Sequence, residues 1–419
     1  MTTLPPGPLP LVAALSDPVE AVPGRWVMRV TLAGIGLWAG FFGPIQVLLA
    51  QQAEVVAPGH KQFVFGLVTG VGSAVSVVVN PIAGALSDRT TSRFGRRVPW
   101  VVGGALSGAL ALLLLAVADS VWLMLLAWCL AQVGLNAMFA AITAAVPDVV
   151  PVRQRGVVGG WVAVSQTLGI VVGVGIASST GGLVAGYAAT AAAVVVLAVP
   201  YVVGSMDYRL SPVLRAELSR ASLVRALWIS PREHPDFAWA WVTRFLVNLG
   251  NSLGTLLLYF YLQDAVHYSD PEGGVFVLTL LYAVFIVLST VVSGIWSDRL
   301  GRRKVFVNVS GAVVGVAALT LAVAHTWAGA LVGAVVLGIG YGVYLSVDFA
   351  LCTEVLPTAT DRAKDLGVIN IAVTLPQVFA PFVGSLLVTF AGGYTTLYAV
   401  AAAVCLLASL FVRNIRSVR

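Results

Sequence analysis

The chain has 419 residues, of which 59% are hydrophobic and only 10% are charged. In a soluble protein of this length, about a quarter of the residues would be charged. The composition therefore excludes a soluble protein and indicates a helical protein that crosses a membrane several times. The net charge of +6 would favour nucleic-acid binding in a soluble chain, but in a membrane protein it follows from the excess of Lys and Arg in cytoplasmic loops.

The first residues, MTTLPPGPLPLVAALSDPVE, lack the basic start and the small-residue cleavage site of a signal peptide. We therefore expect residues 1–24 to be a disordered cytoplasmic tail. Apolar runs of roughly 20 residues, the length that crosses a bilayer, then follow one another along the chain. Polar residues, glycines and prolines divide these runs into twelve predicted spans: 26–50, 62–86, 98–117, 121–146, 157–178, 183–204, 237–263, 274–296, 304–323, 327–350, 367–390 and 393–412.

The basic residues predict the orientation of the spans. The connections on one side carry Lys61 as their only basic residue, whereas those on the other side carry about twenty arginines and lysines. Because Lys and Arg are enriched in cytoplasmic loops, both termini are predicted to lie in the cytoplasm, with the chain in the cell membrane. The longest connection, 205–236, is then a cytoplasmic linker between two six-span bundles, 25–204 and 237–412, and 413–419 form a cytoplasmic tail.

Four landmarks of the first half recur about 210 residues later in the second half. Two halves of six spans in the same orientation form a parallel repeat, which predicts an all-α membrane protein with two pseudo-symmetric six-helix bundles. The paired landmarks are WVMR (26–29) with WVTR (241–244), GALSDRTTSRFGRR (84–97) with GIWSDRLGRRK (294–304), PDVVPVRQRG (147–156) with TEVLPTATDRA (353–363), and QTLG (166–169) with VTLP (373–376).

These landmarks resemble those of the major facilitator superfamily, and the resemblance covers nearly the whole chain. The basic turns after spans 2 and 8 are similar to the family's G-x-x-x-D-R-x-G-R-R turn. Asp148 and Arg155, with six residues between them, are similar to the acid–six–arginine pattern of sugar porters, and Glu354 and Arg362 are one residue further apart. The longer first turn, SDRTTSRFGRR, is similar to that of sucrose–proton symporters and the glycoside–pentoside–hexuronide group.

The resemblance implies the major facilitator fold, alternating access, a proton as the coupling ion and no cofactor. Span 1 lacks the acid and span 4 lacks the arginine of sucrose–proton symporters, which argues against sucrose itself as the solute. The leading hypothesis is proton-coupled symport of a sugar or a glycoside-like solute. Proton-driven efflux of drugs or metabolites stays open, although span 5 lacks the Gly-Pro motif of drug antiporters, and so does a lipid or lysolipid carrier.

The two basic turns are predicted to form a cytoplasmic gate. Gly84 and Gly294 would let a neighbouring helix approach, Asp88 and Asp298 would face a helix N-terminus, and the arginines would bridge to acids after spans 4 and 10. The alternative, that the arginines only set topology, leaves the repeated acid unexplained. The predicted gate residues are Gly84, Asp88, Arg89, Arg93, Arg96, Arg97, Asp148, Arg155, Gly294, Asp298, Arg299, Arg302, Arg303, Glu354 and Arg362.

Asp348 is the only acid well inside a predicted span, and a buried acid in a membrane needs a functional or structural reason. Its spacing from Tyr341 and Tyr344 places the three side chains on one helix face. Arg244 in span 7 shares a face with Asn248 and Asn251. Asp348 and Arg244 are therefore candidates for proton coupling, with a purely structural ion pair as the alternative.

Other polar and aromatic side chains within spans are candidates for the substrate cavity, or for hydrogen bonds between helices. Amides and aromatic rings favour a neutral, hydroxyl-rich solute. The cavity candidates are Trp38, Gln46, Asn80, Gln132, Asn136, Gln166, Asn248, Asn251, Tyr341, Tyr344, Asn370 and Gln377.

The sequence offers no sign of an enzyme. It has no G-x-x-x-x-G-K-[ST] loop, and its three cysteines and four histidines lack metal-ligand spacing. The expected partners are a small-molecule substrate and the lipid bilayer, without nucleic acid, metal or cofactor. One chain already contains both halves of the repeat, so a monomer is expected.

Overall fold

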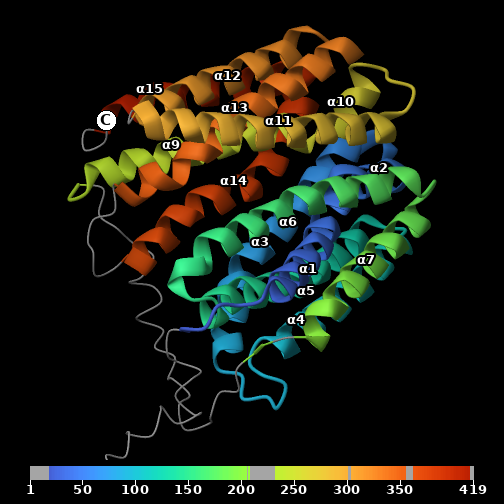
Figure 1. Cartoon of the computed structure of the whole chain (residues 1–419). Helices are drawn as coiled ribbons and strands as arrows, with labels where there is room; N and C mark the ends of the chain where they lie inside the picture. The colour runs from blue at the N-terminus through green and yellow to red at the C-terminus, as the bar shows by residue number, and fades with distance from the viewer. Residues whose placement is uncertain (1–17, 205, 208–231, 301–302, 355–361, 416–419) are drawn as a thin grey trace, which may run out of the picture. The chain divides into compact units, whose positions relative to one another are not determined.

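The computed structural model describes residues 18–204, 206–207, 232–300, 303–354 and 362–415, and every regular element among them is helical (Figure 1). Eleven helices of this described part are long and apolar enough to cross a membrane, and one further pair, bent by 44°, makes twelve if it counts as one span. The predicted all-α membrane fold with about twelve spans is confirmed.

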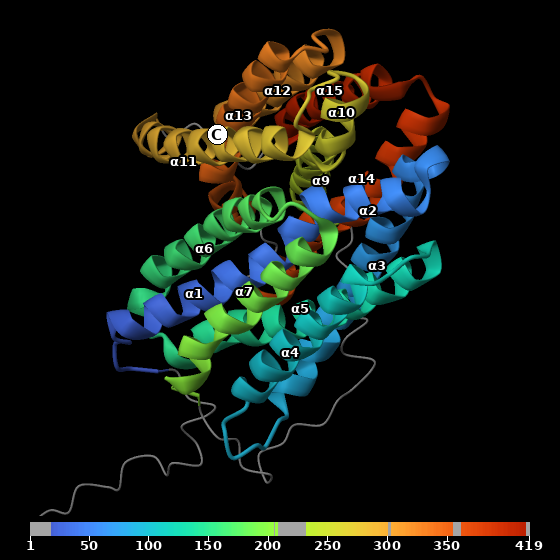
Figure 2. The same cartoon turned by 90° about the vertical axis from the view of Figure 1, so that its right-hand side faces the viewer.

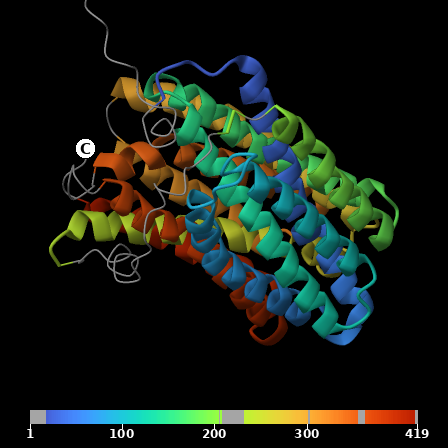
Figure 3. The same cartoon turned by 90° about the horizontal axis from the view of Figure 1, so that it is seen from below.

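Figures 2 and 3 show these helices from two further directions. The first repeat contains α1 (Gly24–Gly43), α2 (Leu49–Val56), α3 (Lys61–Asp88), α4 (Val98–Ala116), α5 (Val121–Val149), α6 (Val152–Ser179) and α7 (Leu183–Val203). The second repeat contains α9 (Pro235–Leu256), α10 (Leu258–Asp264), α11 (Pro271–Leu300), α12 (Arg303–Val323), α13 (Trp327–Glu354), α14 (Arg362–Phe390) and α15 (Gly393–Phe411).

Packing divides the chain into two compact units. Unit 1 takes in the chain up to Leu48 and from Gly72 to Leu218, and unit 2 takes in Leu49–Val71 and the chain from Ser219 onward. These units differ from the two expected bundles in one respect. The end of span 1 and the beginning of span 2, which belong to the first repeat, pack with the second repeat.

Small residues set the closest helix contacts of unit 1. A Cβ added to Gly43 of α1 would lie 2.8 Å from the carbonyl oxygen of Gly173 in α6, so both helices need glycine at this crossing. A Cβ added to Gly104 of α4 would lie 2.6 Å from the carbonyl oxygen of Gly134 in α5. Close backbone approach of this kind drives helix association in membranes, where apolar side chains gain little by leaving lipid.

Larger side chains fill the core of unit 2. Phe237 and Val247 of α9, Tyr344 of α13 and Ile369 of α14 are buried together, and Trp241 packs against them. The Trp241 indole also donates to the carbonyl oxygen of Val368 at 3.0 Å. This core fixes the faces of α9 and α13 that carry the embedded charged residues.

The corresponding spans of the two repeats are both interrupted. In span 1, a single π-helical turn, Pro44–Leu48, separates α1 from α2. In span 7, the chain bends by 44° at Leu257 between α9 and α10. When the two repeats are aligned on the WVMR and WVTR landmarks, the break in span 7 lies within one helical turn of the position of the π-helical turn in span 1.

The last residues of the expected N-terminal tail have a defined structure. Val22 is 4% exposed. Its N–H donates to Oε1 of Gln154 in α6 at 2.9 Å, and its carbonyl oxygen accepts from Nε2 of the same amide at 3.0 Å. The expectation of disorder up to residue 24 is therefore wrong for this end of the tail, because one glutamine satisfies both backbone groups of Val22.

Candidate functional site

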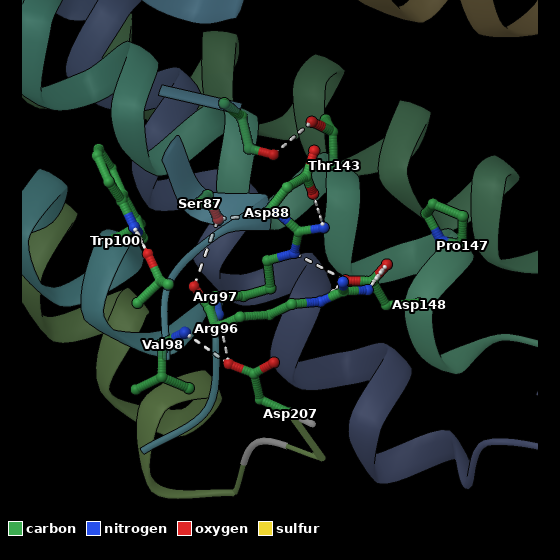
Figure 4. A network of polar contacts seen from close by, with 12 residues as sticks. Ser87, Asp88, Arg96, Arg97, Val98, Trp100, Thr143, Pro147, Asp148 and Asp207 are labelled. Atoms are coloured by element: carbon green, nitrogen blue, oxygen red, sulfur yellow. Dashed lines mark hydrogen bonds and ion pairs between the residues drawn. The ribbon is translucent and has the colours of Figure 1, made fainter. Parts of the chain in front are cut away.

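The basic turn between α3 and α4 forms a network around one buried arginine (Figure 4). Arg97 is 3% exposed, and its guanidinium donates to Asp88 at 2.5 Å, to Asp148 at 2.7 Å and to Ser87 at 2.9 Å. Arg96 forms a second ion pair with Asp148 at 2.6 Å. Two arginines thus join carboxylates from the ends of α3 and α5, as the sequence predicted for Asp148. Asp88, which was expected to face a helix N-terminus, contacts the Arg97 side chain.

Asp207, after the end of α7, completes this network and was missed by the sequence analysis. Its carboxylate accepts the backbone N–H of Arg97 at 2.5 Å and that of Val98 at 2.9 Å, at the N-terminus of α4 (Figure 4). These amides lack partners within the helix, and a carboxylate also suits the positive end of the helix dipole. Burial raises the pKa of Asp207, although the amides of Val98 and Arg97 act to lower it.

The charge balance of the network favours an ionised Arg97. Burial alone would lower the pKa of Arg97, but the hydrogen bonds and negative charges of Asp148 and Asp88 raise it overall. Arginine is suited to this position because its planar guanidinium presents several donors in fixed directions. The arrangement can hold the ends of α3, α4, α5 and α7 together within unit 1.

Other predicted gate residues of the first turn lie around this network. Arg93 is exposed and lies 4.7 Å from the ring centre of Phe94. Arg155 donates to the carbonyl oxygens of Val150 at 3.0 Å and Pro147 at 3.2 Å. Arg89 is half-buried at the end of α3.

The two gate glycines take part in no close helix contact among the described residues. A Cβ added to Gly84 would meet no described atom within 4 Å, so no helix approaches it closely. At Gly294 the nearest atom is Cβ of Ser346 at 3.9 Å, an ordinary contact. Both glycines lie on helix faces that leave room for a side chain.

The second basic turn is only partly described. Arg299 is exposed at the end of α11, and Lys304 donates from Nζ to the carbonyl oxygen of Ile415. The two repeats are alike in this respect. In each repeat, a residue that follows the sixth span contacts the beginning of the third span: Asp207 in the first repeat and Ile415 in the second. The side chains of the remaining candidates in this half lie outside the described residues: Asp298, Arg302, Arg303, Glu354, Arg362 and Asn370.

A second network lies inside unit 2, between α9 and α13. Asp348 is 7% exposed, and its Oδ2 lies 3.2 Å from Nη2 of Arg244. The Tyr344 hydroxyl donates to the other oxygen, Oδ1, at 2.5 Å. The structure therefore brings together the two candidate coupling residues that lie about a hundred residues apart in sequence, and it adds Tyr344 as a direct partner of the acid.

Further along α9, asparagines and tyrosines continue this network. The Tyr341 hydroxyl donates to Oδ1 of Asn248 at 2.9 Å, and the Tyr282 hydroxyl donates to Oδ1 of Asn251 at 2.8 Å. The rings are stacked, with centroids 6.4 Å apart between Tyr282 and Tyr341 and 5.8 Å apart between Tyr341 and Tyr344. Tyr282 on α11 was not among the sequence candidates, because a single tyrosine in an apolar span gives no periodic signal.

The α9–α13 network combines an ionisable pair with neutral hydrogen-bonding groups. A buried carboxylate and a buried guanidinium stabilise each other, and removing the charge of one leaves the other uncompensated. Amide and phenol groups can exchange hydrogen bonds with hydroxyl groups of a solute. The arrangement can therefore link a change of protonation to the binding of a polar molecule.

The remaining cavity candidates are spread over several helices. In unit 1, Asn136 donates to the backbone and side-chain oxygens of Gln132, at 2.8 and 2.9 Å, so these two amides are paired with each other. Trp38 packs edge-on against Phe139, with ring centroids 5.4 Å apart. Gln46 is 7% exposed in the π-helical turn, and its Oε1 has no hydrogen-bond partner among the described residues.

Three other candidates form none of the contacts described above. Asn80 on α3 and Gln166 on α6 are half-buried, and Gln377 on α14 is exposed. Among the described residues, no group of three or more His, Cys, Asp or Glu side chains could hold a metal ion.

Comparison with known sequences identifies one family. The sequence profile of the Major Facilitator Superfamily matches residues 30–291 and again residues 241–418, which together cover nearly the whole chain. The repeated match agrees with the two-copy pattern of the landmarks.

Individual relatives match shorter stretches. The chain is 49% identical over 79 residues to an uncharacterized symporter of Synechocystis sp., covering 17% of this chain and 14% of that protein. It is 29% identical over 109 residues to a sucrose transport protein of Arabidopsis thaliana, covering 26% of this chain and 21% of that protein. The matched regions thus span about a fifth or less of these relatives.

Among solved structures, the chain is similar to a peptide transporter, named POT, in complex with sulfate. The TM-score is 0.76, the identity is 14%, and the alignment covers 98% of both chains. At this identity the likeness concerns the fold alone.

Proposed function

Because the chain belongs to the major facilitator superfamily of membrane transporters, we propose that it is a proton-coupled symporter of a neutral, hydroxyl-rich solute such as a sugar or a glycoside. The observation that carries this proposal is the buried pair of Asp348 and Arg244 beside the row of asparagines and tyrosines in unit 2. In this proposal the protein acts as a monomer in the cell membrane, with both termini in the cytoplasm.

Asp348 is the proposed carrier of the coupled proton. In its ionised form it pairs with Arg244, and a buried pair of this kind avoids an isolated charge in a low-dielectric interior. When Asp348 takes up a proton, the guanidinium of Arg244 loses its counter-charge and favours a different arrangement. A protonation event then biases a two-state equilibrium, which is what coupling requires.

The proposed solute contacts are the side chains next to this pair. Asn248, Asn251, Tyr282 and Tyr341 are neutral, and each has hydrogen-bonding atoms that a hydroxyl group can engage. Stacked tyrosine rings also suit the apolar faces of sugar rings. The similarity to a symporter and to a sucrose transport protein supports this choice of solute over a charged one.

The Arg97 network is the proposed cytoplasmic gate. The Arg97 side chain forms ion pairs with Asp88 and Asp148, and its backbone N–H donates to Asp207, so the ends of four helices of unit 1 meet at this residue. Such a network can change state as a whole, so it suits a transporter that alternates between two conformations.

The proposal is tested by reconstituting the protein in liposomes, imposing a pH gradient and recording proton flux with a panel of sugars, cationic drugs and lysolipids. We expect one or more sugars to elicit proton influx. Asp348→Asn should abolish the proton flux while leaving sugar exchange between the two sides of the membrane. Asp119→Asn, at an exposed acid before α5, is the matched control and should behave like the wild type.

Three results would contradict parts of the proposal. Proton flux that is unchanged by Asp348→Asn would exclude Asp348 as the coupling residue. Extrusion of cationic drugs without uptake of any sugar would identify an efflux transporter. Movement of lysolipids without either would identify a lipid carrier.

A further inference from the structure

Directly after α15, the chain forms a short 3-10 turn, η4 (Val412–Asn414), that belongs to the core of unit 2. Val412 is 1% exposed, and Ile415, the residue after the turn, is 0% exposed. The turn packs against α9 and α12 as well as against its own helix. Segments that follow the last helix of a domain are usually held loosely, so the complete burial of these two apolar side chains needs a reason.

Two side chains of α12 hold this segment in place. Nζ of Lys304 donates to the carbonyl oxygen of Ile415. One turn further along α12, Nδ2 of Asn308 donates to the carbonyl oxygen of Ser409 at 2.5 Å, and the Ser409 hydroxyl donates to the carbonyl oxygen of Asn308 at 2.8 Å. These three hydrogen bonds fix the end of α15 and the turn after it on the beginning of α12.

Val412 and Ile415 belong to the same core as the residues that flank the ion pair of Arg244 and Asp348. At the rise of an α-helix, Arg244 lies roughly 13 Å from the beginning of α9, and Asp348 lies roughly 9 Å from the end of α13. The η4 turn contributes to the apolar layer at this end of unit 2, where α12 begins. The flanking residues in this core are Ala240 and Val247 of α9 and Val347 and Leu351 of α13.

Entry of water into this layer would be favourable if the packing allowed it. The Thr243 hydroxyl, next to Arg244, is buried and has no hydrogen-bond partner among the described residues. Water that reached it would supply a partner and would also solvate the charges of Arg244 and Asp348. Close apolar packing opposes this entry, so the residues that complete the layer control the access of water to the ion pair.

The anchor of the η4 turn occurs in the half of the chain that carries the ion pair. When the two basic turns are aligned on their GRR residues, Lys304 falls opposite Val98 in the first repeat. In the same alignment, Ile142 falls opposite Asp348. The lysine and the acid are therefore both specific to the second repeat, as expected if the lysine serves the ion pair.

We propose that the η4 turn is a seal that keeps water on the side of the second basic turn away from the ion pair of Asp348 and Arg244. Protons then reach Asp348 along the path of the solute and not through the core of unit 2. This inference rests on the proposed role of Asp348 in proton coupling. Val412 and Ile415 are positioning residues, because they act through the pair, and Lys304 anchors them.

The seal is tested by two measurements on the full-length protein in liposomes without any solute. The first is the rate at which a small charged methanethiosulfonate reagent modifies the thiol of Ala240→Cys, at a position one turn before Arg244 that is 2% exposed. Mass spectrometry of the peptide that contains residue 240 gives this rate. The second measurement is the proton flux under an imposed pH gradient.

Ile415→Ser opens a polar gap in the apolar layer, so the modification rate and the proton flux should both rise about tenfold or more. Adding Asp348→Asn should return the proton flux to the wild-type value and leave the modification rate high. Ile415→Leu keeps the apolar volume and should behave like the wild type. Ile295→Ser is the matched control, because it makes the same substitution at a position of α11 that is 49% exposed, and it should change neither quantity.

An unchanged modification rate in Ile415→Ser would overturn the proposal, whichever solute the protein carries. A proton leak that persists after Asp348→Asn would also overturn it, because that leak would not pass through the ion pair. If Ile415→Ser does not fold, Lys304→Met takes its place, since it removes the anchor and leaves the core side chains unchanged. Failure of the proposed function is a separate result, namely a solute-driven proton flux that Asp348→Asn leaves unchanged.

Discussion

Tyr344 donates its hydroxyl hydrogen to Oδ1 of Asp348 over 2.5 Å, from one helical turn away on α13. The other carboxylate oxygen lies 3.2 Å from Arg244 of α9. One oxygen of the acid is therefore held by a neutral donor of its own helix, and the other by a charged donor of a different helix. The two contacts have different strengths and different consequences when they are removed.

Tyr344→Phe is expected to destabilise the protein more than Tyr341→Phe does. The first change removes a hydrogen bond to a carboxylate, which contributes about 1.5–3 kcal/mol, and the second removes one to the neutral Asn248, which contributes about 0.5–1.5 kcal/mol. Thermal unfolding of both variants in the same detergent measures the difference. Equal losses of stability in the two variants would show that Asp348 does not accept the hydrogen bond of Tyr344 as a charged carboxylate.

Arg244→Gln is expected to destabilise the fold by about 3–5 kcal/mol, because it leaves the buried Asp348 carboxylate without its cation. The double variant Arg244→Gln with Asp348→Asn removes both charges and should recover much of this loss. Unfolding of the two single variants and the double variant gives the coupling energy. A double variant no more stable than Arg244→Gln alone would contradict a direct ion pair.

Arg97→Lys is expected to weaken the network of the first basic turn, although it keeps the charge. A lysine ammonium cannot reach Asp88, Asp148 and Ser87 in the directions that a guanidinium can. We expect a loss of stability of about 1–3 kcal/mol and slower transport. Arg93→Lys makes the same change at an exposed position and should stay within about 0.5 kcal/mol of the wild type; similar losses in both variants would contradict a special role for Arg97.

The stability of Asp207→Asn relative to the wild type should rise with pH. Burial raises the pKa of Asp207 above the ordinary value of 3.8, so folding favours the protonated carboxyl. The wild type therefore loses stability as the pH rises from the ordinary value through the raised pKa, whereas asparagine does not titrate. Melting temperatures of both proteins at about pH 4 and pH 7 test this. A difference that is constant or falls with pH would contradict it.

Local sequence patterns were sufficient to predict several of the side-chain contacts in the candidate site. The face shared by Tyr341, Tyr344 and Asp348 follows from helical periodicity, and the structure places the three side chains in one network. The contact of the basic turn with Asp148 could be expected because the acid follows the fourth span as the turn follows the second. No described atom lies within 4 Å of a Cβ added to Gly84, and a small residue permits a close approach but does not by itself bring a helix to it.

By itself, the sequence determined the membrane class, the approximate spans and the two-copy organisation, since these depend on composition and spacing along the chain. Only the tertiary structure decided which side chains meet. Asp207 reaches the N-terminus of α4, and Lys61 reaches Asp264, from 110 and 203 residues away. No periodicity records such contacts, because they depend on how the ends of separate helices are placed by packing.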